Sequence, residues 1–178
     1  TYTTSVKTGY RILSGFARVN YDYNYRYMVS LVARYDGISK LSDNRWGFFP
    51  GISAGWNVHE EAFFKDSKFA EVVSLIKPRI SYGLNGNVNG IGNFDVYGKY
   101  GSVGAYNGNL GYLNTGVVNS KLRWEKSHTF ELGLDLGFFN NRIHMIMDYY
   151  DRTTSDLLTD VNLPEYTGFP SFKTNLGT

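Results

Sequence analysis

The stretch YMVSLVARYD, residues 27–36, gives the clearest indication of the fold class of this chain. Its alternate residues form two unlike faces, which is the period of a β-strand. The first face is aliphatic at its centre and aromatic at both ends, and consists of Tyr27, Val29, Leu31, Ala33 and Tyr35. In a soluble protein nothing favours a tyrosine at each end of the apolar face of a strand. A membrane-crossing strand places amphipathic rings at both interfaces. The stretch therefore predicts a transmembrane β-strand with one face in lipid.

The same pattern recurs along the chain. Residues 130–138 present a second aliphatic face with aromatic ends, made of Phe130, Leu132, Leu134, Leu136 and Phe138. A partner strand over 143–150 follows a tight turn at 139–142, where asparagines tolerate positive φ. Three further strands are predicted over 15–23, 52–58 and 76–85. These six segments predict an all-β, antiparallel transmembrane β-barrel.

The lengths of the connections predict their side of the membrane. Tight turns at 24–26 and 139–142 alternate with longer loops, which are 39–47, 85–127 and 154–174. Outer-membrane barrels have short periplasmic turns and long external loops. We therefore place the long loop, about 85–127, on the extracellular face. The connector 59–75, with a short helix around 63–73, falls on the periplasmic side despite its length.

Six strands are too few for a closed barrel, since the smallest membrane barrels use about eight. Two weakly strand-like stretches, 94–100 and 111–118, raise the count to about six to eight. The last residues, 175–178, resemble the start of another strand. We predict that residues 1–178 are part of one larger barrel domain.

Composition excludes several other classes. The 178 residues include no cysteine, so there is no disulfide framework, zinc–thiolate site or thiol nucleophile. A formal net charge of +2 does not suggest nucleic acid. The first five residues show no signal-peptide pattern. No apolar run is long enough for a transmembrane helix.

We find no catalytic or metal-binding pattern. Gly51–Gly55 fits G-x-S-x-G, but that motif needs a sharp turn after its serine, and here the strand alternation continues into Trp56. Ser53 is therefore predicted to be structural. His59, His128 and His144 lack the spacing of metal ligands. We predict no enzyme activity and no cofactor.

The long loop carries the candidate contact residues. Four tyrosines lie among asparagines in this loop: Tyr97, Tyr100, Tyr106 and Tyr112. They could stiffen a self-packed loop, dock a partner protein, or contact substrate directly. The predicted interior face carries mixed charges, namely Arg18, Arg34, Lys77, Arg79, Asp22, Asp36, Glu131, Asp135 and Asp148. Cross-strand pairing is the favoured interpretation, and a balanced wall suits neutral or zwitterionic cargo.

Several short strings, in one order over residues 10–177, resemble the SusC/RagA family of TonB-linked outer-membrane proteins. They are RYDG (34–37), NRWGFFP (44–50), SAGW (53–56), ISYG (80–83) with GN (86–87), LRWE (122–125), GLD (133–135), DYYDR (148–152) and DLL (156–158). The resemblance implies a late portion of a 22-stranded plugged barrel in the bacterial outer membrane. The signal peptide, TonB box and plug domain are missing from the sequence.

The same resemblance implies uptake of oligosaccharides or peptides. A SusD-like surface lipoprotein would capture cargo, and the TonB complex would act through the absent plug. A soluble β-rich carbohydrate-binding or adhesin module is the alternative. The aromatic-ended faces and the alternation of loop lengths argue against it.

Overall fold

The computed structural model describes residue 5 and residues 7–177, without the side chain of Tyr106. The first four residues, part of the stretch with no signal-peptide pattern, lie outside this range. In the described part the strands are β1 (Ile12–Tyr23), β2 (Tyr27–Ile38), β3 (Trp46–Trp56), β4 (Val73–Asn87), β5 (Tyr100–Tyr106), β6 (Asn109–Asn114), β7 (Glu125–Phe138), β8 (Ile143–Ser155), β9 (Leu158–Asn162) and β10 (Ser171–Asn175). The helical segments are η1 (Val58–Glu60), α1 (Ala62–Lys65), η2 (Lys68–Glu71) and η3 (Glu165–Thr167).

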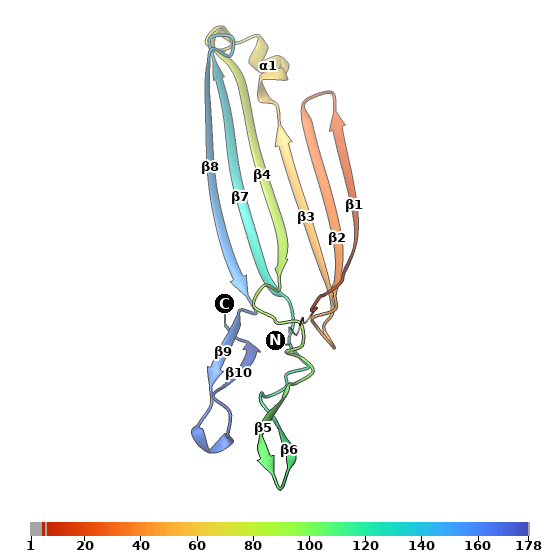
Figure 1. Cartoon of the computed structure of the whole chain (residues 1–178). Helices are drawn as coiled ribbons and strands as arrows, with labels where there is room; N and C mark the ends of the chain where they lie inside the picture. Colours follow the sequence, from red (N-terminus) through yellow and green to blue (C-terminus); the bar gives the residue numbers. More distant parts are fainter. Residues whose placement is uncertain (1–4, 6, 178) are drawn as a thin grey trace.

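Six strands form one antiparallel sheet in the order β1-β2-β3-β4-β7-β8 (Figure 1). They are the six strands predicted from the alternation. Among the described residues β5 pairs only with β6, through a turn in which Asn107 and Gly108 both have positive φ. The prediction that the long loop adds strands to the barrel is wrong, because these two short segments pair with each other. β10 likewise pairs with β9, so residues 171–175 belong to a separate hairpin.

The register places one kind of side chain on each face of the sheet. One row across all six strands is apolar and consists of Tyr21, Val29, Ala54, Ile80, Leu132 and Tyr149. The next row is polar and consists of Asn20, Ser30, Ser53, Ser81, Glu131 and Tyr150. Because side chains alternate along every strand, the two rows lie on opposite faces.

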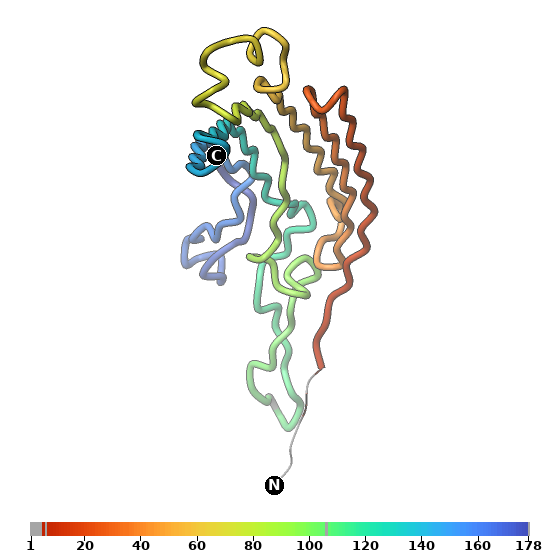
Figure 2. The backbone as a smooth tube through the Cα atoms, turned by 90° about the horizontal axis from the view of Figure 1, so that it is seen from above, coloured from red at the N-terminus to blue at the C-terminus, as the bar shows by residue number. Residues whose placement is uncertain are grey.

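The two ends of the sheet differ, as the loop lengths predict. The tight turns after β1 and β7 and the helix α1 lie at one end, and the β5–β6 and β9–β10 hairpins lie at the other (Figure 1). Figure 2 also shows the connector 57–72 and the β5–β6 hairpin at opposite ends of the backbone. We call the hairpin end the rim and the other end the turn end. The observed long loop is 88–124, because β4 and β7 extend further than predicted.

Two prolines limit the pairing of β3 with β4. This ladder runs only from Gly51 to Gly55 on β3 and from Arg79 to Gly83 on β4. Pro50 and Pro78 lie immediately outside it. Because prolines have no backbone N–H group, their position outside the ladder means that no hydrogen bond between β3 and β4 is lost.

The hydrophobic core lies at the rim rather than between sheets. Loops 39–45 and 88–124 pack against the interior face there, and the buried cluster is Ile38, Leu41, Phe49, Val88, Ile91, Val96, Leu122 and Trp124. The Phe49 ring meets Trp124 edge to face, with centroids 5.3 Å apart. The Trp124 indole N–H donates to the carbonyl of Arg45 at 3.1 Å. This packing fixes the long loop on the end of the sheet.

Candidate functional site

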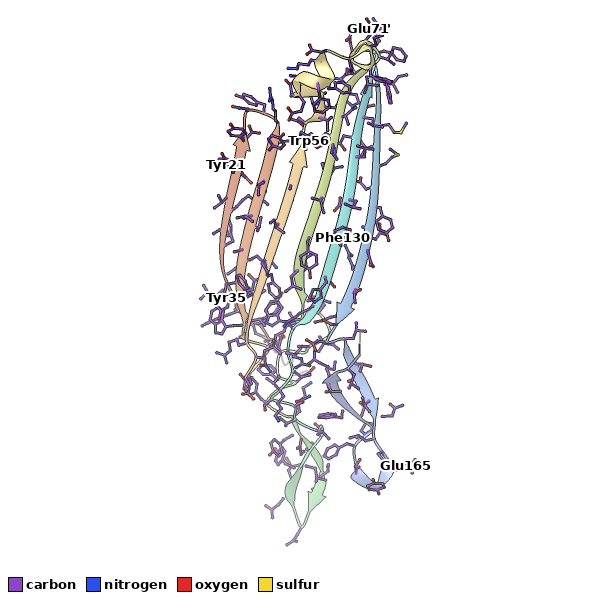
Figure 3. All side chains as sticks on the ribbon, turned by 180° about the vertical axis from the view of Figure 1, so that it is seen from behind. Tyr21, Tyr35, Trp56, Glu71, Phe130 and Glu165 are labelled. Carbon is purple, nitrogen blue, oxygen red and sulfur yellow. The ribbon has the colours of Figure 1, made fainter. Side chains whose placement is uncertain are left out.

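The apolar face forms a belt bounded by aromatic rings. At its centre, Leu31 is 47% exposed and Ile52 is 50% exposed, as expected for residues that face lipid rather than a protein core. Tyr27 stacks on Trp56 at the turn end, and Tyr35 stacks on Trp46 at the rim with centroids 5.0 Å apart. Figure 3 shows Tyr21 and Trp56 toward one end of the sheet and Tyr35 toward the other.

The height of this belt matches a membrane. Tyr27 and Tyr35 are eight residues apart on β2. At about 3.4 Å per residue they are separated by about 27 Å along the strand, which corresponds to about 19–22 Å across the membrane at the strand tilt of about 35–45° found in outer-membrane barrels. The apolar band of these barrels, about 25 Å tall, is of similar height.

A carboxylate anchors the aromatic ring at the turn end. Glu61 precedes α1 and accepts hydrogen bonds from the Tyr27 hydroxyl at 2.7 Å, the Trp56 indole N–H at 3.2 Å and Arg26 at 3.3 Å. The Tyr27 hydrogen bond contributes most to lowering the pKa of Glu61, and Trp56 and Arg26 add to it against the opposing effect of burial. The connector is thereby fixed to the edge of the belt.

The interior face carries an ion-pair network across three strands. The Arg79 guanidinium on β4 donates to Asp135 on β7 at 2.8 Å and to Asp148 on β8 at 3.0 Å. Gly133 on β7 lies directly between Arg79 and Asp148 in the ladder, and a Cβ there would be only 2.8 Å from Arg79 Cζ and from Asp148 Oδ1. The glycine therefore lets the guanidinium cross β7. The predicted cross-strand charge pairing is confirmed at these positions.

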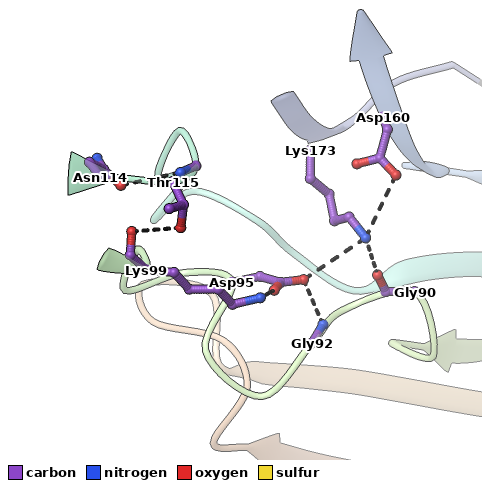
Figure 4. Close-up of polar contacts among 9 residues, drawn as sticks. Gly90, Gly92, Asp95, Lys99, Asn114, Thr115, Asp160 and Lys173 are labelled. Atoms are coloured by element: carbon purple, nitrogen blue, oxygen red, sulfur yellow. Dashed lines mark hydrogen bonds and ion pairs between the residues drawn. The ribbon is translucent and has the colours of Figure 1, made fainter. Parts of the chain in front are cut away.

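At the rim, Asp95 clamps the long loop to the β9–β10 hairpin (Figure 4). Its carboxylate accepts the Gly92 N–H at 2.7 Å and pairs with Lys99 at 3.0 Å and with Lys173 at 3.9 Å. Lys173 also donates to the carbonyl of Gly90 at 2.6 Å. Burial by itself would raise the pKa of Asp95, but the Gly92 N–H and the two ammonium groups outweigh it and hold the pKa below its ordinary value.

The structure places the predicted loop tyrosines on an exposed projection. Tyr97 precedes β5 and is 56% exposed. Tyr100 on β5 and Tyr112 on β6 share one face of the hairpin, because they lie opposite Asn114 and Ser102 in the same ladder. The side chain of Tyr106 lies outside the described part. The hairpin thus brings Tyr100 and Tyr112 together, and their contact role stays a prediction.

Ser53 and its neighbours form no nucleophile elbow. Ser53 lies within β3, directly between Ser30 on β2 and Ser81 on β4. The strand continues to Trp56, as the alternation predicts. In the described residues no helix is long and apolar enough to cross a membrane.

The whole chain, residues 1–178, matches the family described as "TonB dependent receptor-like, beta-barrel". The chain belongs to this family of TonB-dependent receptors. It is 37% identical to TonB-dependent receptor P39 of Formosa agariphila over 96% of this chain and 16% of that protein. It is 38% identical to the TonB-dependent receptor SusC of Bacteroides thetaiotaomicron, over 98% of this chain and 18% of SusC.

Solved structures agree with this assignment. The RagAB peptide transporter superposes with a TM-score of 0.85 and 31% identity, over 94% of this chain and 18% of that chain. The chain therefore spans about 16–18% of the length of these relatives. It is an antiparallel segment of a TonB-dependent receptor barrel of the outer membrane, in a family of transporters and not of enzymes. The family assignment rejects the alternative interpretation of the sequence as a soluble carbohydrate-binding or adhesin module.

Two tertiary contacts of this TonB-dependent receptor segment could not be predicted from local sequence. The buried rim cluster and the Asp95–Lys173 clamp join residues that lie far apart in the chain. Asp95 ends the glycine-rich stretch NGIGNFD, residues 89–95. No local spacing connects Asp95 with a lysine 78 positions later.

Proposed function

We propose that this chain is the barrel segment of an outer-membrane importer that takes up oligosaccharides or peptides. Cargo would be delivered by a SusD-like surface lipoprotein, and energy would come from the TonB complex acting on a plug domain elsewhere in the full receptor. The family assignment and the likeness to SusC and to the RagAB peptide transporter support this proposal.

The observation that carries the partner contact is the apolar surface of the β5–β6 hairpin. Tyr100 is 76% exposed, Leu110 is 63% exposed and Tyr112 is 66% exposed, and all three lie on one face of the hairpin. A two-stranded hairpin that projects from the sheet cannot bury such a face by itself. Exposed tyrosines lose little conformational entropy when they bind, so they suit a protein or sugar contact.

Removal of this face tests the partner contact. In the full receptor, Tyr100→Ser with Tyr112→Ser should weaken retention of the surface lipoprotein on the purified receptor about tenfold, with a parallel loss of cargo uptake. Leu113→Ser, opposite Gly101 on the other face of the ladder, is the matched control and should bind as wild type. Unchanged retention and uptake in the double variant would reject the hairpin as a contact surface.

The proposed sidedness has its own test. The hairpin turn at Asn107 should lie outside the cell, because it is at the end opposite the tight turns. Asn107→Cys in the full receptor should react with an impermeant thiol reagent on intact cells. Labelling only after the outer membrane is breached would show that the rim is periplasmic.

A further inference from the structure

The main sheet has an open edge at the turn end, between β3 and β4. The ladder between these strands ends at Gly55 and Arg79, and β4 continues beyond it through residues 73–78. In the described part of the chain this stretch pairs with β7 alone, opposite Leu134 and Leu136 of the apolar face. The open edge of β4 therefore lies at the level of the membrane, where unpaired backbone groups are not tolerated.

The connector between the two strands covers this edge (Figure 1). η1 lies beside β4, and the His59 Nδ1 is 3.4 Å from the carbonyl oxygen of Ile76. Before α1, the Glu61 carboxylate accepts hydrogen bonds from the side chains of Tyr27 and Trp56. Both aromatic side chains belong to the apolar face, so Glu61 holds the connector at the membrane side of the sheet.

The connector exposes large apolar side chains. Phe63 on α1 is 63% exposed and Phe69 on η2 is 74% exposed, whereas Phe64 is buried. The charged residues between and beside the two exposed rings are themselves exposed, and are Lys65, Asp66, Lys68 and Glu71. Exposed rings interspersed with charged side chains are typical of segments that lie in a membrane interface, with the rings among the acyl chains and the charges at the headgroups.

This apolar surface is continuous with the belt on both sides. Trp56, at one end of the connector, belongs to the aromatic boundary of the belt. At the other end, the carbonyl of the exposed Val72 accepts the N–H of Phe139 at 2.8 Å. The Phe139 side chain is also exposed and follows Phe138, the last belt residue of β7. Because belt residues flank the connector on both sides, lipid is the partner that its exposed rings meet.

We propose that the connector 57–72 is a membrane-interface anchor. Phe63 and Phe69 insert among the acyl chains of the leaflet at the turn end, and the connector shields the open edge of β4 from those chains. The partner is phospholipid, and the inference depends neither on the cargo nor on the surface lipoprotein. A plug domain or another protein that covers the same rings is the competing occupant.

The full receptor in phosphatidylcholine vesicles tests this contact. Phe69→Cys carries a thiol-attached fluorophore, and the lipid is used with ordinary or with brominated acyl chains, because bromine quenches only fluorophores that it touches. Brominated lipid should lower the emission at position 69 about twofold or more, whereas aqueous iodide should have little effect. Glu165→Cys, at the exposed tip of the β9–β10 hairpin, is the aqueous control and should respond to iodide alone. Unsubstituted receptor taken through the same labelling gives the background.

Two outcomes overturn the inference. Quenching of the label at position 69 by iodide but not by brominated lipid would show that the connector lies free in water. A label that neither quencher reaches would show that protein, such as the plug, covers the rings.

A second measurement needs no label. Phe63→Ser with Phe69→Ser should speed hydrogen exchange of residues 57–72 in the vesicles about tenfold, because the segment loses the two rings that hold it in the membrane. Lys68→Ser, an exposed position on η2, is the control and should leave exchange unchanged after correction for intrinsic rates. Unchanged exchange in the double variant would show that the rings contribute no membrane contact.

Discussion

The Phe49 ring packs at the rim in space that two glycines leave open. Its ring is 3% exposed and lies against Gly47 on its own strand and Gly86 on β4, where no β-carbon occupies the space. A Cβ on Gly86 would come within van der Waals overlap of the ring. The ring cannot retreat easily, because Trp124 packs against its other side.

Gly86→Ala should therefore destabilise the full receptor by about 1–3 kcal/mol, as expected for overpacking a filled core. Denaturant unfolding would measure the change, and proteolysis of loop 88–124 would localise it. Gly83→Ala on the same strand has open space around its new methyl group and should change stability by less than about 0.5 kcal/mol. Similar effects of the two substitutions would show that the Phe49 packing is not the cause.

Leu31 tests which face meets lipid. It lies at the centre of the belt, paired with Val19 on one side and Ile52 on the other. Leu31→Arg should destabilise the receptor in vesicles by about 2–4 kcal/mol, the cost of a cation near the bilayer midplane. Val32→Arg, one residue along on the interior face, should cost much less. Equal penalties in unfolding titrations would contradict the assignment of faces.

At the scale of elements, the Asp95 clamp joins the long loop to the β9–β10 hairpin. The pKa of Asp95 is lower in the folded protein than in the unfolded chain, so its contribution is complete above about pH 4 and is lost as the pH falls through the folded value. Hydrogen-exchange protection of residues 88–99 and 158–175, corrected for intrinsic rates, should therefore be equal at pH 7 and pH 5 and should fall below pH 4.

Substitution should have the same effect at neutral pH. Asp95→Asn removes both ion pairs but can still accept the Gly92 N–H, and should speed exchange in these two segments about tenfold, corresponding to ~1.4 kcal/mol. Asp43→Asn is the control, because Asp43 is exposed and has no ion pair among the described residues. Unchanged protection in Asp95→Asn would show that the hydrophobic contacts of the loop are sufficient to hold it.

At the scale of the whole molecule, the sheet is open at both sides. β1 and β8 each pair with one neighbour in the described part, and most of their side chains are exposed. Unpaired backbone groups are not tolerated in lipid, and open edges promote aggregation in water. Expressed alone in detergent, residues 1–178 should aggregate or remain heterogeneous by size-exclusion chromatography. A monodisperse, sharply melting species would show that the segment folds without the rest of its barrel.

The six strands of the sheet, the residues that share each of its faces and the end at which each connection lies were all predictable from the sequence. These features depend on local alternation and loop length, because a period of two fixes the face of every residue once a strand is recognised. The tight turns follow from local chemistry too: Asn24, Asn140 and Asn141 adopt the positive φ that asparagine tolerates.

The course and packing of the long loop could not be predicted from its own residues. Its tyrosines are evident in the sequence, but its weak strands were predicted as possible barrel strands. The alternation within a strand does not indicate which strand it pairs with. The ion-pair partners of Arg79 and Asp95 could not be predicted from the sequence either. Several charged residues lie near Arg79 and near Asp95. Arg79 pairs with Asp135 and Asp148 because of the strand register and the space left by Gly133. Asp95 pairs with Lys173 as well as with Lys99 because the distant β9–β10 hairpin folds back onto the long loop.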